Sequence, residues 1–152
     1  SSGNLPPQEF SVGEVAAYVR LKQIEDWPLL LYGQFAQNFD AESIPGASGD
    51  QDTGWGAGIE VGDKKKLVML GGGYFREEAN FSPAQFTDSD LFDGFTNRKG
   101  WLVYAARELW ANTEVNVTFY KDDPIEDGAV FAVPDAESSE RMRLQTDFVV
   151  KF

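Results

Sequence analysis

The sequence contains no cysteine and no histidine among its 152 residues. Without cysteine, the chain can form no disulfide, no thiolate metal site and no cysteine nucleophile. Without histidine, it lacks the commonest general base and the commonest ligand of transition metals. Carboxylate pairs such as Glu77 and Glu78 fall in expected loops, where nothing would desolvate them. We therefore expect neither an enzyme nor a bound cofactor or metal ion.

Positive charge is also scarce, since 13 basic residues stand against 25 acidic ones and give a formal net charge of −12. Such a chain repels a phosphate backbone, so we expect no nucleic-acid partner. No apolar run approaches the roughly 20 residues that a transmembrane helix needs, which argues against a helical membrane protein. The alternating strands of a membrane β-barrel are compatible with this lack of long apolar runs.

The pattern that does recur has a period of two residues, which is typical of strands with one apolar and one polar face. It predicts seven strands, over 14–22, 29–39, 53–61, 66–76, 101–110, 114–121 and 141–152. Residues 101–110 could instead form a short helix, because Ala105 to Glu108 favour one, but their neighbours favour a strand. A tilted strand that spans a bilayer needs about 9–11 residues, close to the lengths predicted here.

Short and long connections alternate between these strands. The short ones lie around Glu25–Trp27, Gly62–Lys65 and Ala111–Thr113, and the long ones are 40–52, 77–100 and 122–140. An up-and-down barrel of an outer membrane has this alternation, with short periplasmic turns and long external loops. The long segments also hold 16 of the 25 acidic residues, which predicts either ordinary solvated loops or an acidic collar that meets divalent cations or a partner.

Several segments carry a family resemblance. They are Leu31 to Asn38, Asp52 to Asp63, Phe86 to Asp90, Thr113 to Tyr120, and Arg143 to Asp147 followed by the terminal Phe152. On these segments residues 12–152 resemble the C-terminal part of a porin family of Gram-negative bacteria. The last strand with its terminal phenylalanine is similar to the signal that the barrel-assembly machinery recognises in outer-membrane proteins.

The resemblance implies an all-β, antiparallel, up-and-down transmembrane β-barrel in the cell outer membrane, to which this chain supplies about seven strands. It implies passive diffusion of small hydrophilic solutes, with outer-membrane lipid and the assembly machinery as partners. Two alternatives stay open. One is a soluble, lipocalin-like β-barrel that binds a small apolar ligand, and the other is a barrel that acts as a sleeve or adhesin for a protein partner.

The two faces of the strands define the candidate residues. On the last strand we assign Leu144, Phe148, Val150 and Phe152 to lipid and to the assembly signal. The pore-facing candidates share the polar faces: Glu14, Tyr18, Arg20, Lys22, Tyr32, Gln34, Asn38, Glu60, Asn116, Thr118, Tyr120, Arg141, Arg143, Gln145 and Asp147. In a wide barrel such residues line a wet channel.

The expected barrel is incomplete, because seven strands leave two unpaired edges and an open edge is not tolerated in hydrocarbon. We expect residues 1–11 to be a leading loop or tag remnant and 12–152 to be the C-terminal strands of a longer barrel. Residues 5–12 could instead add an eighth strand, or several protomers could assemble.

Overall fold

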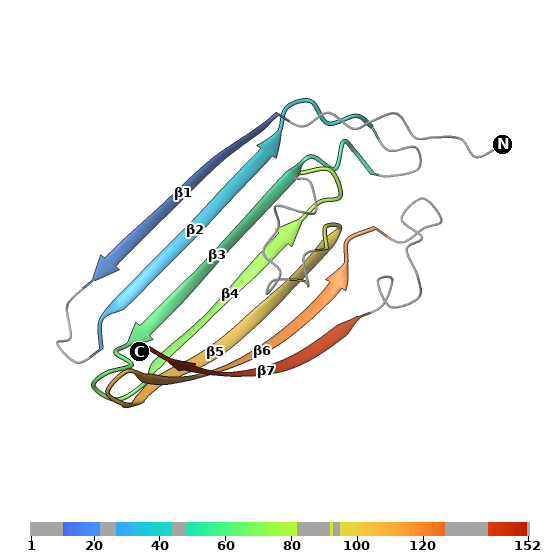
Figure 1. The fold of residues 1–152 in the computed structure, drawn as a ribbon. Helices are drawn as coiled ribbons and strands as arrows, with labels where there is room; N and C mark the ends of the chain where they lie inside the picture. The colour runs from blue at the N-terminus through green and yellow to red at the C-terminus, as the bar shows by residue number, and fades with distance from the viewer. Residues whose placement is uncertain are drawn as a thin grey trace.

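A computed structural model of the chain describes residues 11–21, 27–43, 48–81, 92, 95–126 and 140–151. It contains seven strands in one sheet, in the order of the sequence, and each strand is antiparallel to its neighbours (Figure 1). The strands are β1 Val12–Leu21, β2 Leu29–Asn38, β3 Thr53–Gly62, β4 Met69–Glu77, β5 Arg98–Trp110, β6 Thr113–Pro124 and β7 Arg141–Val150. The predicted all-β, up-and-down fold is confirmed, and the helical alternative for 101–110 is wrong because this whole segment lies within β5.

The connections lie at two different ends of the sheet. Residues 22–28, 63–68 and 111–112 connect strands at one end, which we call the turn end. Residues 39–52, 78–97 and 125–140 connect them at the other, which we call the loop end. At the turn end Asn112 has φ of 66° and Gly62 has φ of 97°, backbone conformations that asparagine and glycine adopt more easily than other residues. The predicted alternation of short and long connections is therefore present in the fold.

Three strands extend further at the loop end than the sequence predicts. Arg98 and Lys99 begin β5, Asp122 and Asp123 lie near the end of β6, and Glu77 ends β4. The sequence pattern predicts these charged residues to lie in the long connections 77–100 and 122–140. They belong to strands because Arg98 and Asp122, from adjacent strands, form a buried ion pair. The long connections are correspondingly shorter, and part of the predicted acidic collar belongs to the sheet.

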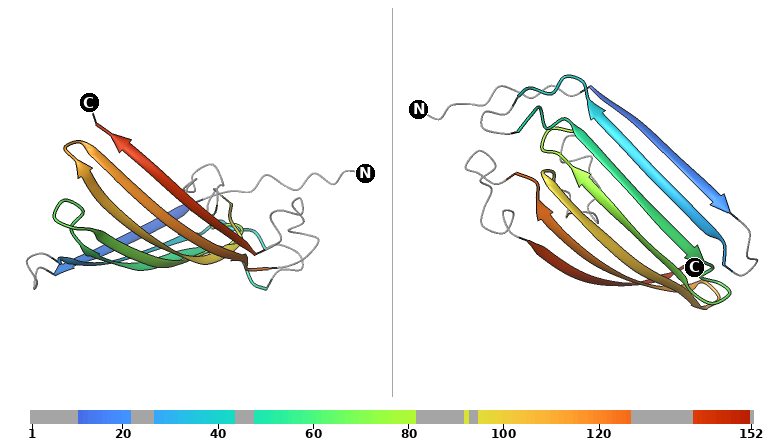
Figure 2. Two further views of the ribbon diagram at one scale, coloured as in Figure 1. Left: turned by 90° about the horizontal axis from the view of Figure 1, so that it is seen from below. Right: turned by 180° about the vertical axis from the view of Figure 1, so that it is seen from behind.

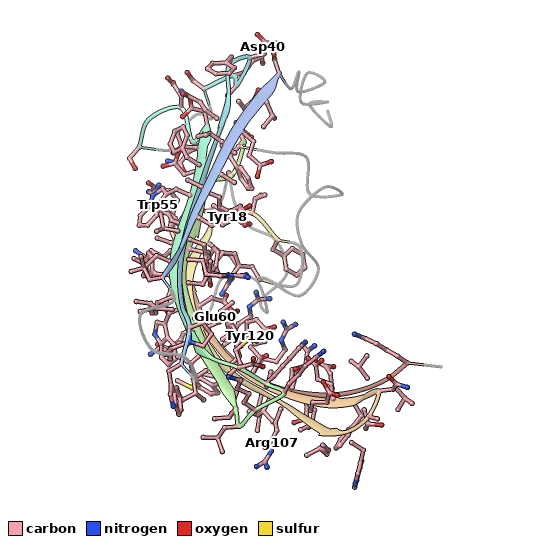
Figure 3. All side chains as sticks on the ribbon, turned by 90° about the vertical axis from the view of Figure 1, so that its left-hand side faces the viewer. Tyr18, Asp40, Trp55, Glu60, Arg107 and Tyr120 are labelled. Atoms are coloured by element: carbon pink, nitrogen blue, oxygen red, sulfur yellow. The ribbon has the colours of Figure 1, made fainter. Side chains whose placement is uncertain are left out.

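The sheet is strongly curved and has a concave and a convex side (Figure 2). Tyr18, Glu60 and Tyr120 point to the concave side, whereas Trp55 and Arg107 point to the convex side (Figure 3). The strand register extends each set across all seven strands, because paired residues of neighbouring strands point to the same side. A bulge between Glu108 and Trp110 shifts the register at the end of β5.

The described residues bury few apolar side chains. Only Phe75, Phe92 and Ala106 are buried hydrophobic residues, whereas 23 large hydrophobic residues are exposed. Most water-soluble domains bury the majority of their large hydrophobic side chains. Exposed apolar surface on this scale marks an interaction site. The described part of the chain contains no helix that is long and apolar enough to cross a membrane.

Glycines let aromatic rings lie flat on the concave side. A Cβ atom at Gly56 would lie 2.2 Å from the Phe75 ring, and one at Gly71 would lie 2.2 Å from the Tyr104 ring. The register pairs each of these glycines directly with the aromatic residue that covers it. The sequence could not assign faces to Gly71–Gly73, since glycine carries no side chain. In the structure Gly71 and Gly73 lie on the concave side and Gly72 on the convex side.

Candidate functional site

The concave face brings the predicted pore-facing residues together. Fourteen of the fifteen share it: Glu14, Tyr18, Arg20, Tyr32, Gln34, Asn38, Glu60, Asn116, Thr118, Tyr120, Arg141, Arg143, Gln145 and Asp147. Lys22 lies outside the described residues, so its side is not assigned. The structure thus places these residues on one surface, and their role as pore lining stays a prediction.

A buried charged cluster lies on this face at the loop end. Arg98 is 1% exposed and Asp122 is 5% exposed, and they form an ion pair across β5 and β6. Arg141 on β7 also pairs with Asp122, at 3.1 Å, so that one carboxylate joins two guanidinium groups. Buried charges of opposite sign need such pairing, since an uncompensated charge in this position would be strongly destabilising.

The same cluster holds the connection between β4 and β5 against the sheet. Arg141 donates a hydrogen bond to the backbone oxygen of Phe92 at 2.8 Å, and its guanidinium lies 5.5 Å from the centre of the Phe95 ring. Phe92 itself is 4% exposed. The described residues of this connection therefore pack on the concave side, where they narrow the space beside β6 and β7.

A pocket of about 380 Å³ opens beside this anchor. Its lining consists of Phe92, Tyr120, Asp122, Arg141, Met142 and Arg143. The Arg143 guanidinium covers the Tyr120 ring at 4.2 Å from the ring centre, a cation–π contact. This part of the concave face is polar, basic and aromatic, which suits contact with hydrated solutes.

The middle of the concave face has a different chemistry. Glu60 on β3 accepts a hydrogen bond from the Tyr104 hydroxyl at 2.8 Å. Tyr32 on β2 lies nearby, and its ring covers Gly58. Four of the five tyrosines of the chain, Tyr18, Tyr32, Tyr104 and Tyr120, share the concave face, and Tyr74 is on the convex side. In the described part of the chain, no group of three or more carboxylates is arranged to hold a metal ion.

The convex face carries an apolar band. Leu144, Phe148 and Val150, the predicted lipid-facing residues of β7, are 68%, 69% and 50% exposed there. Phe152 lies outside the described residues. Towards the loop end the band is aromatic, with the Trp55 and Tyr74 rings 5.6 Å apart and the Trp101 and Phe119 rings 5.5 Å apart.

Charged residues border the band at the loop end. Arg76, Lys99 and Lys121 follow the band on β4, β5 and β6. Arg76 pairs with Glu78, just beyond β4, and Lys121 pairs with Glu140 at 3.2 Å. Partial burial acts to raise the pKa of Glu78, but hydrogen bonds from Arg76 and Thr53 outweigh it and hold that pKa below its ordinary value.

The sequence missed the members of the charged cluster that it had assigned to loops. The pattern places Arg98 and Asp122 in long loops, and it does not distinguish Tyr104 from the other residues of its strand. The one available signal was the period of two itself, since Arg98, Gly100, Leu102 and Tyr104 continue one alternating face.

Comparisons of the chain with protein-family models, with curated proteins and with solved structures found no match.

Proposed function

We propose that this chain forms part of the wall of an outer-membrane porin, through which small hydrophilic solutes diffuse passively. The observation that carries the proposal is the opposite chemistry of the two faces. The convex side is an exposed apolar band with aromatic residues, whereas the concave side holds charged and hydroxyl-bearing side chains. A barrel in lipid needs this distribution, with apolar residues outside and polar residues inside.

The connections support the same proposal. All three turns lie at one end of the sheet and all three longer connections at the other. Barrels of outer membranes have this asymmetry, with short turns on the periplasmic side. Lipid of the outer membrane is then the partner of the convex face, and the barrel-assembly machinery is the proposed partner of the last strand.

The lipocalin-like alternative fits the faces poorly. A carrier of a small apolar ligand needs an apolar interior and a polar exterior. Here the concave face carries Glu60, Asp122, Arg141 and Arg143, and the convex face carries the exposed apolar residues. We therefore favour the channel over the carrier. No contact of the described residues favours the sleeve or adhesin.

The sheet needs further strands to close. Six successive antiparallel pairings make β1 and β7 run in the same direction. A second copy in the same orientation would therefore place its β1 beside β7 as a parallel pair. An odd number of additional strands between β7 and β1 keeps every neighbour antiparallel and leaves no open edge in lipid. Of residues 5–12, which could add a strand, Val12 belongs to β1 and residues 5–10 lie outside the described residues.

The test is channel activity of the protein as it is expressed, purified in detergent. Added to a planar lipid bilayer, it should produce stepwise increases in conductance, and its gel mobility should change on heating. A variant with a charge on the convex face serves as the control, because it should lose both properties together. A protein that is monodisperse in plain buffer and produces no steps would contradict the proposal, since its apolar face must then be covered by protein.

A further inference from the structure

The middle of the concave face combines one carboxylate with two aromatic rings. Glu60 lies on β3, and the register places it in one cross-strand row with Gly71 of β4 and Tyr104 of β5. Tyr104 donates its hydroxyl hydrogen to Glu60 Oε2 at 2.8 Å. Among the described residues no lysine or arginine forms an ion pair with Glu60. The carboxylate is thus held in place by a neutral group, and its charge is not compensated by the sheet.

The two rings lie along the sheet because glycines leave room for them. A Cβ atom at Gly58 would lie 2.3 Å from the Tyr32 ring and hydroxyl, and one at Gly71 would lie 2.2 Å from the Tyr104 ring. One face of each ring therefore covers bare backbone. Both tyrosines are partly exposed, and they stand on β2 and β5, on either side of Glu60 in β3.

Other aromatic rings on this face already hold a cation. Arg143 covers Tyr120 at 4.2 Å, and Arg141 lies 5.5 Å from the centre of the Phe95 ring. In the described part of the chain no cationic side chain covers Tyr32 or Tyr104. Arg20, in the same cross-strand row as Glu60, is two strands away, about 10 Å at the usual spacing of strands. Among the described residues, Glu60 and the two rings therefore have the chemistry of a cation site but no cationic side chain of their own.

We propose that Glu60, Tyr32 and Tyr104 bind an organic cation, such as an amine or a quaternary ammonium group. A tyrosine face attracts a cation through its quadrupole, and a carboxylate adds charge attraction. The net charge of −12 raises the local concentration of cations around the protein. This inference names the solute class of the proposed channel, and to that extent it rests on the proposed function.

The experiment measures binding directly, by titration calorimetry of the folded, detergent-purified protein. Choline is the probe, and 3,3-dimethylbutan-1-ol, its uncharged isostere, is the comparison ligand. Choline should bind and the isostere should not. Glu60→Gln should weaken choline binding about tenfold or more, and Tyr104→Leu should weaken it by about 2–30-fold, the range of one cation–π contact. Tyr104→Phe keeps the ring and should retain most of the binding.

Two matched controls separate the site from general effects. Asp147→Asn removes another concave carboxylate, and Tyr74→Leu removes the tyrosine of the convex side; both should bind choline as the unchanged protein does. Equal binding of choline and its isostere, or undiminished binding to folded Glu60→Gln protein, would overturn the inference. Calorimetry needs no conducting pore. Choline binding without conductance would therefore refute the channel alone, and conductance without choline binding would refute this site alone.

Discussion

The replacement of Val103 by arginine is the most direct test of the two faces. Val103 lies in β5 on the convex side and is 48% exposed. The convex residues of this strand begin with Lys99 and reach Arg107 at the turn end. Val103 lies midway between these two cations, so it marks the middle of the apolar band on its own strand.

The expected cost follows from this depth. Lys99 and Arg107 are eight residues apart, or about 26 Å along the strand at about 3.3 Å per residue. A strand tilt of about 40° reduces this to about 20 Å across the membrane. An arginine at the centre of such a band destabilises a lipid-embedded barrel by about 2–4 kcal/mol, and near the interface by about 0–1 kcal/mol.

The matched control is Leu102→Arg, one residue away on the same strand. Leu102 lies at the same depth on the concave face, opposite Gly73 and Tyr120. If that face borders water, a cation there costs little, and the free energy of unfolding should change by less than about 1 kcal/mol. The assay is urea unfolding in lipid vesicles, followed by tryptophan fluorescence. If Val103→Arg unfolded at the same urea concentration as Leu102→Arg, the assignment of the convex face to lipid would be refuted.

Three further changes test other parts of the structure in the same unfolding assay. Gly58→Ala should reduce the free energy of unfolding by about 1–3 kcal/mol, because the new Cβ would lie 2.3 Å from the Tyr32 ring and 2.7 Å from a backbone oxygen. Gly33→Ala is the control and should be neutral, because its Cβ would meet only a backbone oxygen, at 3.6 Å. Asp122→Asn removes the carboxylate that two arginines share and should cost about 3–5 kcal/mol, and Asp123→Asn, on the opposite face, should cost far less. Because the pKa of Glu78 is lowered in the folded protein, its contribution is complete above the ordinary glutamate pKa of about 4.3 and is lost as the pH falls further. Glu78→Gln should therefore reduce the acid sensitivity of stability, and an unchanged pH profile would count against this role.

The faces of the strands could be predicted from the sequence because side chains alternate strictly along a strand. In β7 Arg143, Gln145 and Asp147 alternate with Leu144 and Phe148, and the structure keeps these two sets on opposite sides. The alternation does not predict which residues of different strands lie at the same level between the turn end and the loop end. Phe148 belongs to the same cross-strand row as Arg107, through Val115, and only the register between strands reveals this.

The ends of the strands were harder to predict than their faces. A charged residue next to a loop resembles another loop residue in a single sequence, and Arg98 and Asp122 were interpreted in that way. Their burial depends on a partner 24 residues away, which the pattern of either strand alone does not contain. The Glu60 site was only half predicted for the same reason, since Tyr104 reaches Glu60 across two strand pairings.

The succession of neighbours in this sheet also makes it modular. Each strand pairs only with the strands that precede and follow it in the chain. One hairpin, such as β3 with β4 and the turn at 63–68, could therefore be deleted or duplicated without reversing the direction or the faces of any other strand. A change by two strands would alter the circumference of a closed barrel while each remaining hairpin kept its local contacts. The width of such a wall can therefore change in evolution by steps of one hairpin.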